Sequence, residues 1–103
     1  MFDFLFGFGR HKIKDALRQG ATIVDVRTVH EYDQGRLRGS INIPLDRIPA
    51  STERIRQMKK PVIFCAAGDG RSGNAANFIK REGIKEVYNG GNWEKLLQMI
   101  NNL

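Results

Sequence analysis

A single cysteine, Cys65, stands in the stretch FCAAGDGRSG and is the only cysteine among 103 residues. It follows the apolar run 61–64 and precedes a segment with the pattern of a helix. Between Cys65 and Arg71, every residue except Asp69 is glycine or alanine. Small residues let the backbone curl tightly and turn successive N–H groups inward, which makes an anion-binding loop. The positive end of the following helix and the guanidinium of Arg71 would strengthen the attraction for an anion.

The same surroundings predict reactivity at Cys65. Inward N–H groups, a helix dipole and Arg71 favour a thiolate, and a pKa lowered from about 8.5 to about 6.5 would leave the residue mostly ionised at neutral pH. We therefore interpret Cys65 as a candidate nucleophile; the alternative is a buried, inert cysteine. We expect Asp69 to face solvent, because an inward carboxylate would repel an anion. The candidate substrate-binding residues are Ala66, Ala67, Gly68, Asp69, Gly70, Arg71 and Ser72.

The elements that would position this loop alternate between strand and helix. Strands are predicted at 21–26, 41–43, 61–64 and 87–88, and helices at 11–19, 28–35, 51–58, 71–83 and 93–100, with a turn at 89–91. Thr28 is the predicted N-cap of the second helix, and Ser51 or Thr52 that of the third. This alternation is typical of an α/β domain with a small, mostly parallel sheet flanked by helices. In such domains ligands bind outside the carboxyl ends of the strands, where Cys65 is expected.

Length, net charge and cysteine count limit the classes of function that this protein can have. The length fits one domain at 11–103, preceded by a Phe-rich N-terminal arm at 1–10. We expect the arm to pack against the domain as a short strand or turn; the alternative is an arm that binds a membrane or a partner. The net charge of +6 is spread along the chain, so we expect no nucleic-acid partner. The arm is too short to span a bilayer and lacks the features of a signal peptide, so we expect a cytoplasmic protein without a membrane partner. A lone cysteine excludes an internal disulfide and a cysteine-based metal centre, and we expect no metal and no cofactor.

Several motifs, in order from about Lys12 to Leu97, resemble those of the single-domain rhodaneses, a family of sulfurtransferases. They are Ile23-Val24-Asp25-Val26-Arg27, Glu31 followed by Gly35-Arg36-Leu37-Arg38-Gly39-Ser40-Ile41-Asn42-Ile43-Pro44, Cys65 with Arg71-Ser72, and Val87-Tyr88-Asn89-Gly90-Gly91 with Trp93. The resemblance implies a rhodanese-like fold. It also implies a Cys65 persulfide, which takes sulfur from a small anionic donor such as thiosulfate and passes it to cyanide, a thiol or a protein acceptor. By the same resemblance Asp25, Arg27 and Glu31 are structural residues near the site.

Two departures from the family pattern leave alternatives open. Arg36 stands where the family usually has histidine. Five residues separate Cys65 from Arg71, whereas typical family members have four, and Cys-x5-Arg is the spacing of dual-specificity phosphatases. Those phosphatases usually carry histidine before the cysteine, where this chain has Phe64, which favours sulfur over phosphate. A cysteine-dependent phosphatase or arsenate reductase, and a non-catalytic module that carries a persulfide or binds a protein, stay as alternatives.

Overall fold

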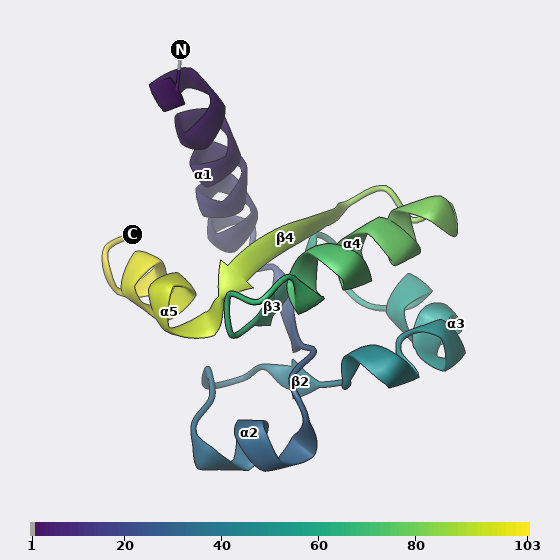
Figure 1. Ribbon diagram of the computed structural model, residues 1–103. Helices are drawn as coiled ribbons and strands as arrows, with labels where there is room; N and C mark the ends of the chain where they lie inside the picture. Colours follow the sequence, from purple (N-terminus) through teal and green to yellow (C-terminus); the bar gives the residue numbers. More distant parts are fainter. Residues whose placement is uncertain (1) are drawn as a thin grey trace.

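The computed structural model describes the backbone of residues 2–103 and the side chains of residues 9–103. Helices and strands alternate along the chain (Figure 1). The helices are α1 (Phe2–Arg18), α2 (Val29–Gln34), α3 (Thr52–Arg56), α4 (Arg71–Arg81) and α5 (Trp93–Asn101), with short 3-10 turns η1 (Leu45–Arg47) and η2 (Pro49–Ser51). The strands are β1 (Thr22–Asp25), β2 (Ile41–Asn42), β3 (Val62–Ala66) and β4 (Val87–Asn92).

The strands form one parallel sheet in the order β2-β1-β3-β4, which confirms the predicted fold class. All five residues of β3 are buried, as expected for a central strand covered on both faces. In the pairing of β1 with β3, Asp25 lies opposite Cys65. The carboxyl ends of these two strands therefore bring a carboxylate and the thiol to the same edge of the sheet.

The two faces of the sheet carry separate apolar clusters. Alternate side chains of a strand point to opposite faces. Phe64 and Ala66 pack with residues of α3 and α4, whereas Ile63 and Cys65 pack with residues of α1 and α5. The strand that carries Cys65 thus turns the thiol away from the helix that follows it.

Strands β3 and β4 both run further than the sequence predicted. β3 continues through Cys65 and Ala66, and β4 includes the predicted turn at 89–91. The pairing shifts here, because Phe64 pairs with Asn89 but Cys65 pairs with Gly91, which leaves Gly90 as an extra residue. A Cβ on Gly90 would lie 2.5 Å from Cγ2 of Ile63, so only glycine fits. The glycine pair marks a bulge within a strand rather than the end of one.

Helix α1 begins at Phe2, so the short strand or turn expected for the N-terminal segment is wrong. Ile13 and Ala16 pack its second half against the sheet, and the first half extends away from the domain (Figure 1). A strand needs a partner edge for its backbone hydrogen bonds, whereas extending an existing helix adds one internal bond per residue. The packing predicted for the phenylalanines lies outside the described side chains. The division into an arm at 1–10 and a domain at 11–103 stays a prediction.

The helix caps agree with the sequence in one case and differ in another. Thr28 caps α2, as predicted from the sequence, and the structure adds a capping box with Glu31. The hydroxyls of Ser51 and Thr52 do not cap α3; they donate to the carbonyl oxygens of Arg47 and Pro49 in the preceding turns. Two 3-10 turns lead directly into α3, and their carbonyl oxygens lie close enough to accept from these hydroxyls. None of the helices in the described part of the chain is long and apolar enough to cross a membrane.

Candidate active site

Cys65 is fully buried near the end of β3. Burial, and then the negative charge of Asp25, raise the pKa of the Cys65 thiol to about 12, with the charge of Arg27 acting in the opposite direction. The predicted low-pKa thiolate is therefore wrong for the ligand-free protein. The sequence predicts Cys65 just beyond the strand, beside N–H groups and a helix end. In the structure it lies within the strand, where loss of hydration favours the neutral thiol.

Asp25 and Arg27 form a buried ion pair next to the thiol. Nε and Nη2 of Arg27 lie 3.0 Å and 2.7 Å from Oδ2 of Asp25, and the backbone N–H of Arg27 donates to Oδ1 at 2.9 Å. The Asp25 side chain is fully buried and that of Arg27 is 6% exposed. Such a pair is costly to break, because either partner alone would be an uncompensated buried charge.

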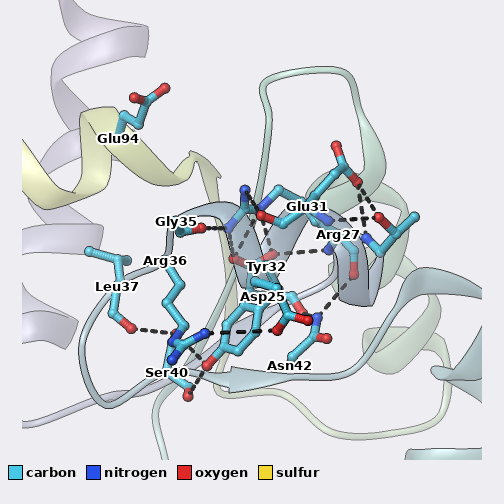
Figure 2. A network of polar contacts seen from close by, with 12 residues as sticks. Asp25, Arg27, Glu31, Tyr32, Gly35, Arg36, Leu37, Ser40, Asn42 and Glu94 are labelled. Atoms are coloured by element: carbon cyan, nitrogen blue, oxygen red, sulfur yellow. Dashed lines mark hydrogen bonds and ion pairs between the residues drawn. The ribbon is translucent and has the colours of Figure 1, made fainter.

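Arg27 also holds the segment that follows β1. Its guanidinium donates to the carbonyl oxygens of Glu31 at 3.3 Å and Gly35 at 2.6 Å, across the span of α2 (Figure 2). On its other side the guanidinium lies 4.8 Å from the ring centroid of Trp93. Arg27 therefore links β1, both ends of α2 and the start of α5. The contacts of Asp25 and Arg27 are those of residues that hold the site together.

Arg71 is paired with two carboxylates. Its Nη1 and Nη2 lie 2.6 Å and 3.0 Å from the two oxygens of Glu31, and its Nε lies 2.8 Å from Oδ2 of Asp69. Hydrogen bonds from Arg71, and then from the backbone of Thr28, lower the pKa of Glu31 to about 2. The hydrogen bond from Arg71 also lowers the pKa of Asp69. Asp69 is exposed, as predicted, but its carboxylate is turned back onto the arginine of its own loop.

The loop between β3 and α4 lies at the surface and turns at two glycines. Ala67, Gly68, Asp69 and Gly70 are exposed, and both glycines have positive φ, of 82° and 94°. The carboxylate of Asp69 accepts a hydrogen bond from Arg71, the arginine at the end of the same loop. Among the residues that the structure describes, none accepts a hydrogen bond from the backbone N–H of Ala67, Gly68 or Gly70. These donors are therefore open to a ligand.

The two ends of the predicted binding segment are placed differently from its middle. The side chain of Ala66 packs in the apolar cluster beside α4. Ser72 is buried, and its hydroxyl donates to Oδ1 of Asn89 at 2.7 Å. Residues 67–70 thus form the exposed part of the loop and Arg71 is half-buried, while Ala66 and Ser72 anchor it.

Sequence reasoning missed the role of two asparagines in holding this loop. Asn92 donates from Nδ2 to the carbonyl oxygen of Ala67 at 3.3 Å, and its Oδ1 caps α5. Oδ1 of Asn89 accepts from Ser72 and from the backbone of Gly91. Both residues belong to β4, the neighbour of β3. Parallel strands end at one edge, so polar residues near the end of β4 could have been assigned to the site.

A hollow of the described surface lies away from this loop. It has a volume of about 440 Å³, between α1 and α5, and is lined by Arg10, Lys14, Lys95, Gln98, Met99 and Asn102. Within the described residues, no group of three His, Cys, Asp or Glu side chains is arranged to hold a metal ion. The residues that line this hollow do not include the loop beside Cys65.

The fold and the loop define a class of protein, and sequence comparison identifies it. The family model of the rhodanese-like domain matches residues 10–95, so the chain belongs to the rhodanese-like domain family. The resemblance noted from the motifs is therefore confirmed.

Relatives of the chain include two Bacillus subtilis proteins. It is 35% identical over 69 residues to the uncharacterized protein YqhL, covering 67% of this chain and 54% of the relative. It is 31% identical over 71 residues to the putative sulfur carrier protein YrkF, covering 69% of this chain and 38% of the relative. The chain thus spans about half or less of the length of these relatives.

Among solved structures, the reduced form of Bacillus anthracis CoADR-RHD aligns with a TM-score of 0.66 and 28% identity. The alignment covers 97% of this chain and 18% of that one. Of these relatives, YrkF is the one described as a putative sulfur carrier.

Proposed function

We propose that the protein is a sulfurtransferase that carries a sulfane sulfur as a persulfide on Cys65. The observation that carries the proposal is the exposed loop 67–70, directly after the strand that bears the chain's lone cysteine. The backbone N–H groups of Ala67, Gly68 and Gly70 have no partner among the described residues. Membership of the rhodanese-like family and similarity to a putative sulfur carrier support it. The proposed setting is cytoplasmic, with a small anionic donor and a thiol, cyanide or protein acceptor.

The proposed cycle has two balanced steps. In the first, the sulfur of Cys65 attacks the outer sulfur of thiosulfate; the S–S bond of thiosulfate breaks, its electron pair leaves on sulfite, and the thiol proton passes to sulfite. Cys65 is then a persulfide anion. In the second, cyanide takes the outer sulfur as thiocyanate, and the Cys65 sulfur regains a proton from water. The loop N–H groups would stabilise the persulfide charge, as an oxyanion hole stabilises developing charge.

The phosphatase alternative keeps one supporting observation, the five-residue spacing between Cys65 and Arg71. A phosphoryl dianion would have to bind beside Glu31 and Asp69, which already occupy Arg71. Two carboxylates around the single loop arginine disfavour any dianion, a phosphate monoester and thiosulfate alike. Sulfur transfer is the stronger proposal because Phe64 stands where dual-specificity phosphatases usually carry histidine, and because the chain belongs to the rhodanese-like family.

Parallel assays separate the two activities. The protein is incubated with thiosulfate and cyanide, and separately with an aryl phosphate, and thiocyanate and the released phenol are measured. We expect thiocyanate formation that is lost in Cys65→Ser, and no phosphate hydrolysis above that variant. Aryl phosphate hydrolysis that depends on Cys65, without thiocyanate, would replace the proposal with the phosphatase. Neither activity, in a protein with a native circular dichroism spectrum, would favour the non-catalytic module.

A further inference from the structure

Asp69 is the residue of the longer loop whose contacts bear most directly on substrate choice. Its Oδ2 lies 2.8 Å from Nε and 2.7 Å from Nη2 of Arg71, and its Oδ1 faces the backbone N–H of Arg71 at 3.4 Å. Glu31 holds the remaining side of the same guanidinium through two bonds. Every edge of the Arg71 fork therefore faces a carboxylate of the protein itself.

The charge balance at this arginine is unfavourable for an anion. Arg71 contributes one positive charge, while Glu31 and Asp69 contribute two negative charges. Asp25 and Arg27, the other charged pair near the thiol, neutralise each other. An approaching anion thus meets net negative charge unless one carboxylate leaves Arg71.

The two carboxylates differ in how readily they can leave. Glu31 belongs to α2, where it also accepts from the backbone of Thr28 in the capping box, so releasing it disrupts a helix start. Asp69 belongs to an exposed loop between two glycines of positive φ, and its side chain is 46% exposed. Turning Asp69 into water removes only an exposed ion pair, which contributes little stability.

We propose that Asp69 is a specificity-determining residue that competes with anionic sulfur donors for Arg71 and so favours donors of low charge. This inference rests on the proposed sulfur-transfer function and deepens it by naming the donor class. A donor binds Arg71 after displacing Asp69, and the repulsion that remains grows with the donor's charge. Asp69 thus selects by charge rather than by size.

The test uses two donors that share the outer sulfur and differ in charge: thiosulfate, a dianion, and benzenethiosulfonate, a monoanion. Their dissociation constants are measured by calorimetry on Cys65→Ser, which binds without transferring sulfur, with and without Asp69→Asn. Asparagine keeps an oxygen that can accept from Arg71 but removes the charge. Since Coulomb energy scales with the product of charges, Asp69→Asn should tighten thiosulfate binding about fourfold and benzenethiosulfonate binding about twofold.

Two further variants serve as controls. Asp15→Asn removes a carboxylate from a surface pair with Arg18 on α1, away from the loop, and should leave both constants unchanged. Asp69→Glu keeps the charge and should keep the weak thiosulfate binding of the parent. Unchanged or weaker binding in Asp69→Asn, or an equal gain for both donors, would overturn the inference.

The inference and the proposed function can fail separately. Sulfur addition to Cys65 in the wild-type protein, with no gain of affinity in Asp69→Asn, would retain sulfur transfer and remove Asp69 from donor selection. A gain of affinity without any sulfur addition would retain the competition at Arg71 and remove sulfur transfer.

Discussion

At the scale of single residues, Cys65 shows how placement decides reactivity. The thiol lies in a strand covered on both faces and beside Asp25, so the ligand-free protein keeps it protonated. A thiolate forms at this position only when a bound species changes the surroundings or when the pH is high. Because thiolates are the reactive form of cysteine, we expect Cys65 to react slowly with general oxidants.

The pH dependence of alkylation tests this point directly. Because the pKa of Cys65 is raised to about 12, its rate of reaction with iodoacetamide should rise about tenfold per pH unit from pH 7 to 10 without a plateau. The lone cysteine makes the alkylated mass specific for this site. The same protein in denaturant should level off near the ordinary thiol pKa of about 8.5. A plateau of the native rate near pH 7 would contradict the buried, neutral thiol.

At the scale of elements, the ion pair between Glu31 and Arg71 joins the starts of α2 and α4. It fixes the loop arginine to the helix that follows β1 in the chain. The ion pairs of Arg71 with Glu31 and Asp69 occupy the guanidinium, so an anionic donor must displace a carboxylate to bind it. The lowered pKa of Glu31 makes this contact sensitive to acid.

The pair should contribute to stability above pH 4.5 and be lost as the pH falls toward 2. The folded-state pKa of Glu31 is about 2 against an ordinary 4.5, so acid protonates the unfolded chain first and lowers the free energy of unfolding across that window. Because the Glu31 side chain is 35% exposed, solvent screening reduces the contribution to about 1 kcal/mol. Urea unfolding of Glu31→Gln at pH 7 and pH 2 checks this. A deficit that is as large at pH 2 as at pH 7 would show that the charge is not responsible.

The bulge in β4 makes a second prediction for an element. Gly90→Ala should lower the free energy of unfolding by about 1–3 kcal/mol, because its Cβ would enter the packed space beside Ile63. Gly9→Ala is the matched control, since nothing lies within 4 Å of a Cβ there and alanine favours the helix. Thermal unfolding of the two variants compares them. A Gly90→Ala protein as stable as the wild type would mean that β4 lacks the bulge.

At the scale of the whole molecule, the sequence predicted the parallel α/β fold because its apolar runs, caps and glycines act locally. Thr28 and Gly20 mark the helix ends that the structure has. The protonation state of Cys65 could not be predicted from local sequence signals. Its burial depends on α1 and α5, which are distant from Cys65 along the chain. The pairing of Arg71 with Glu31 has the same origin, since forty residues separate them. The position of the loop could be predicted from the sequence, but the ion pairs of Arg71 and the neutral thiol of Cys65 could not.

The central claim is that Cys65 carries sulfur, and the mass of the intact protein tests it most directly. After incubation with thiosulfate and removal of the excess, the wild-type mass should rise by about 32 Da, one sulfur atom, and a thiol reductant should reverse the gain. Cys65→Ser should keep its mass. An unchanged wild-type mass in a natively folded protein, or an equal gain in Cys65→Ser, would contradict a persulfide on this residue.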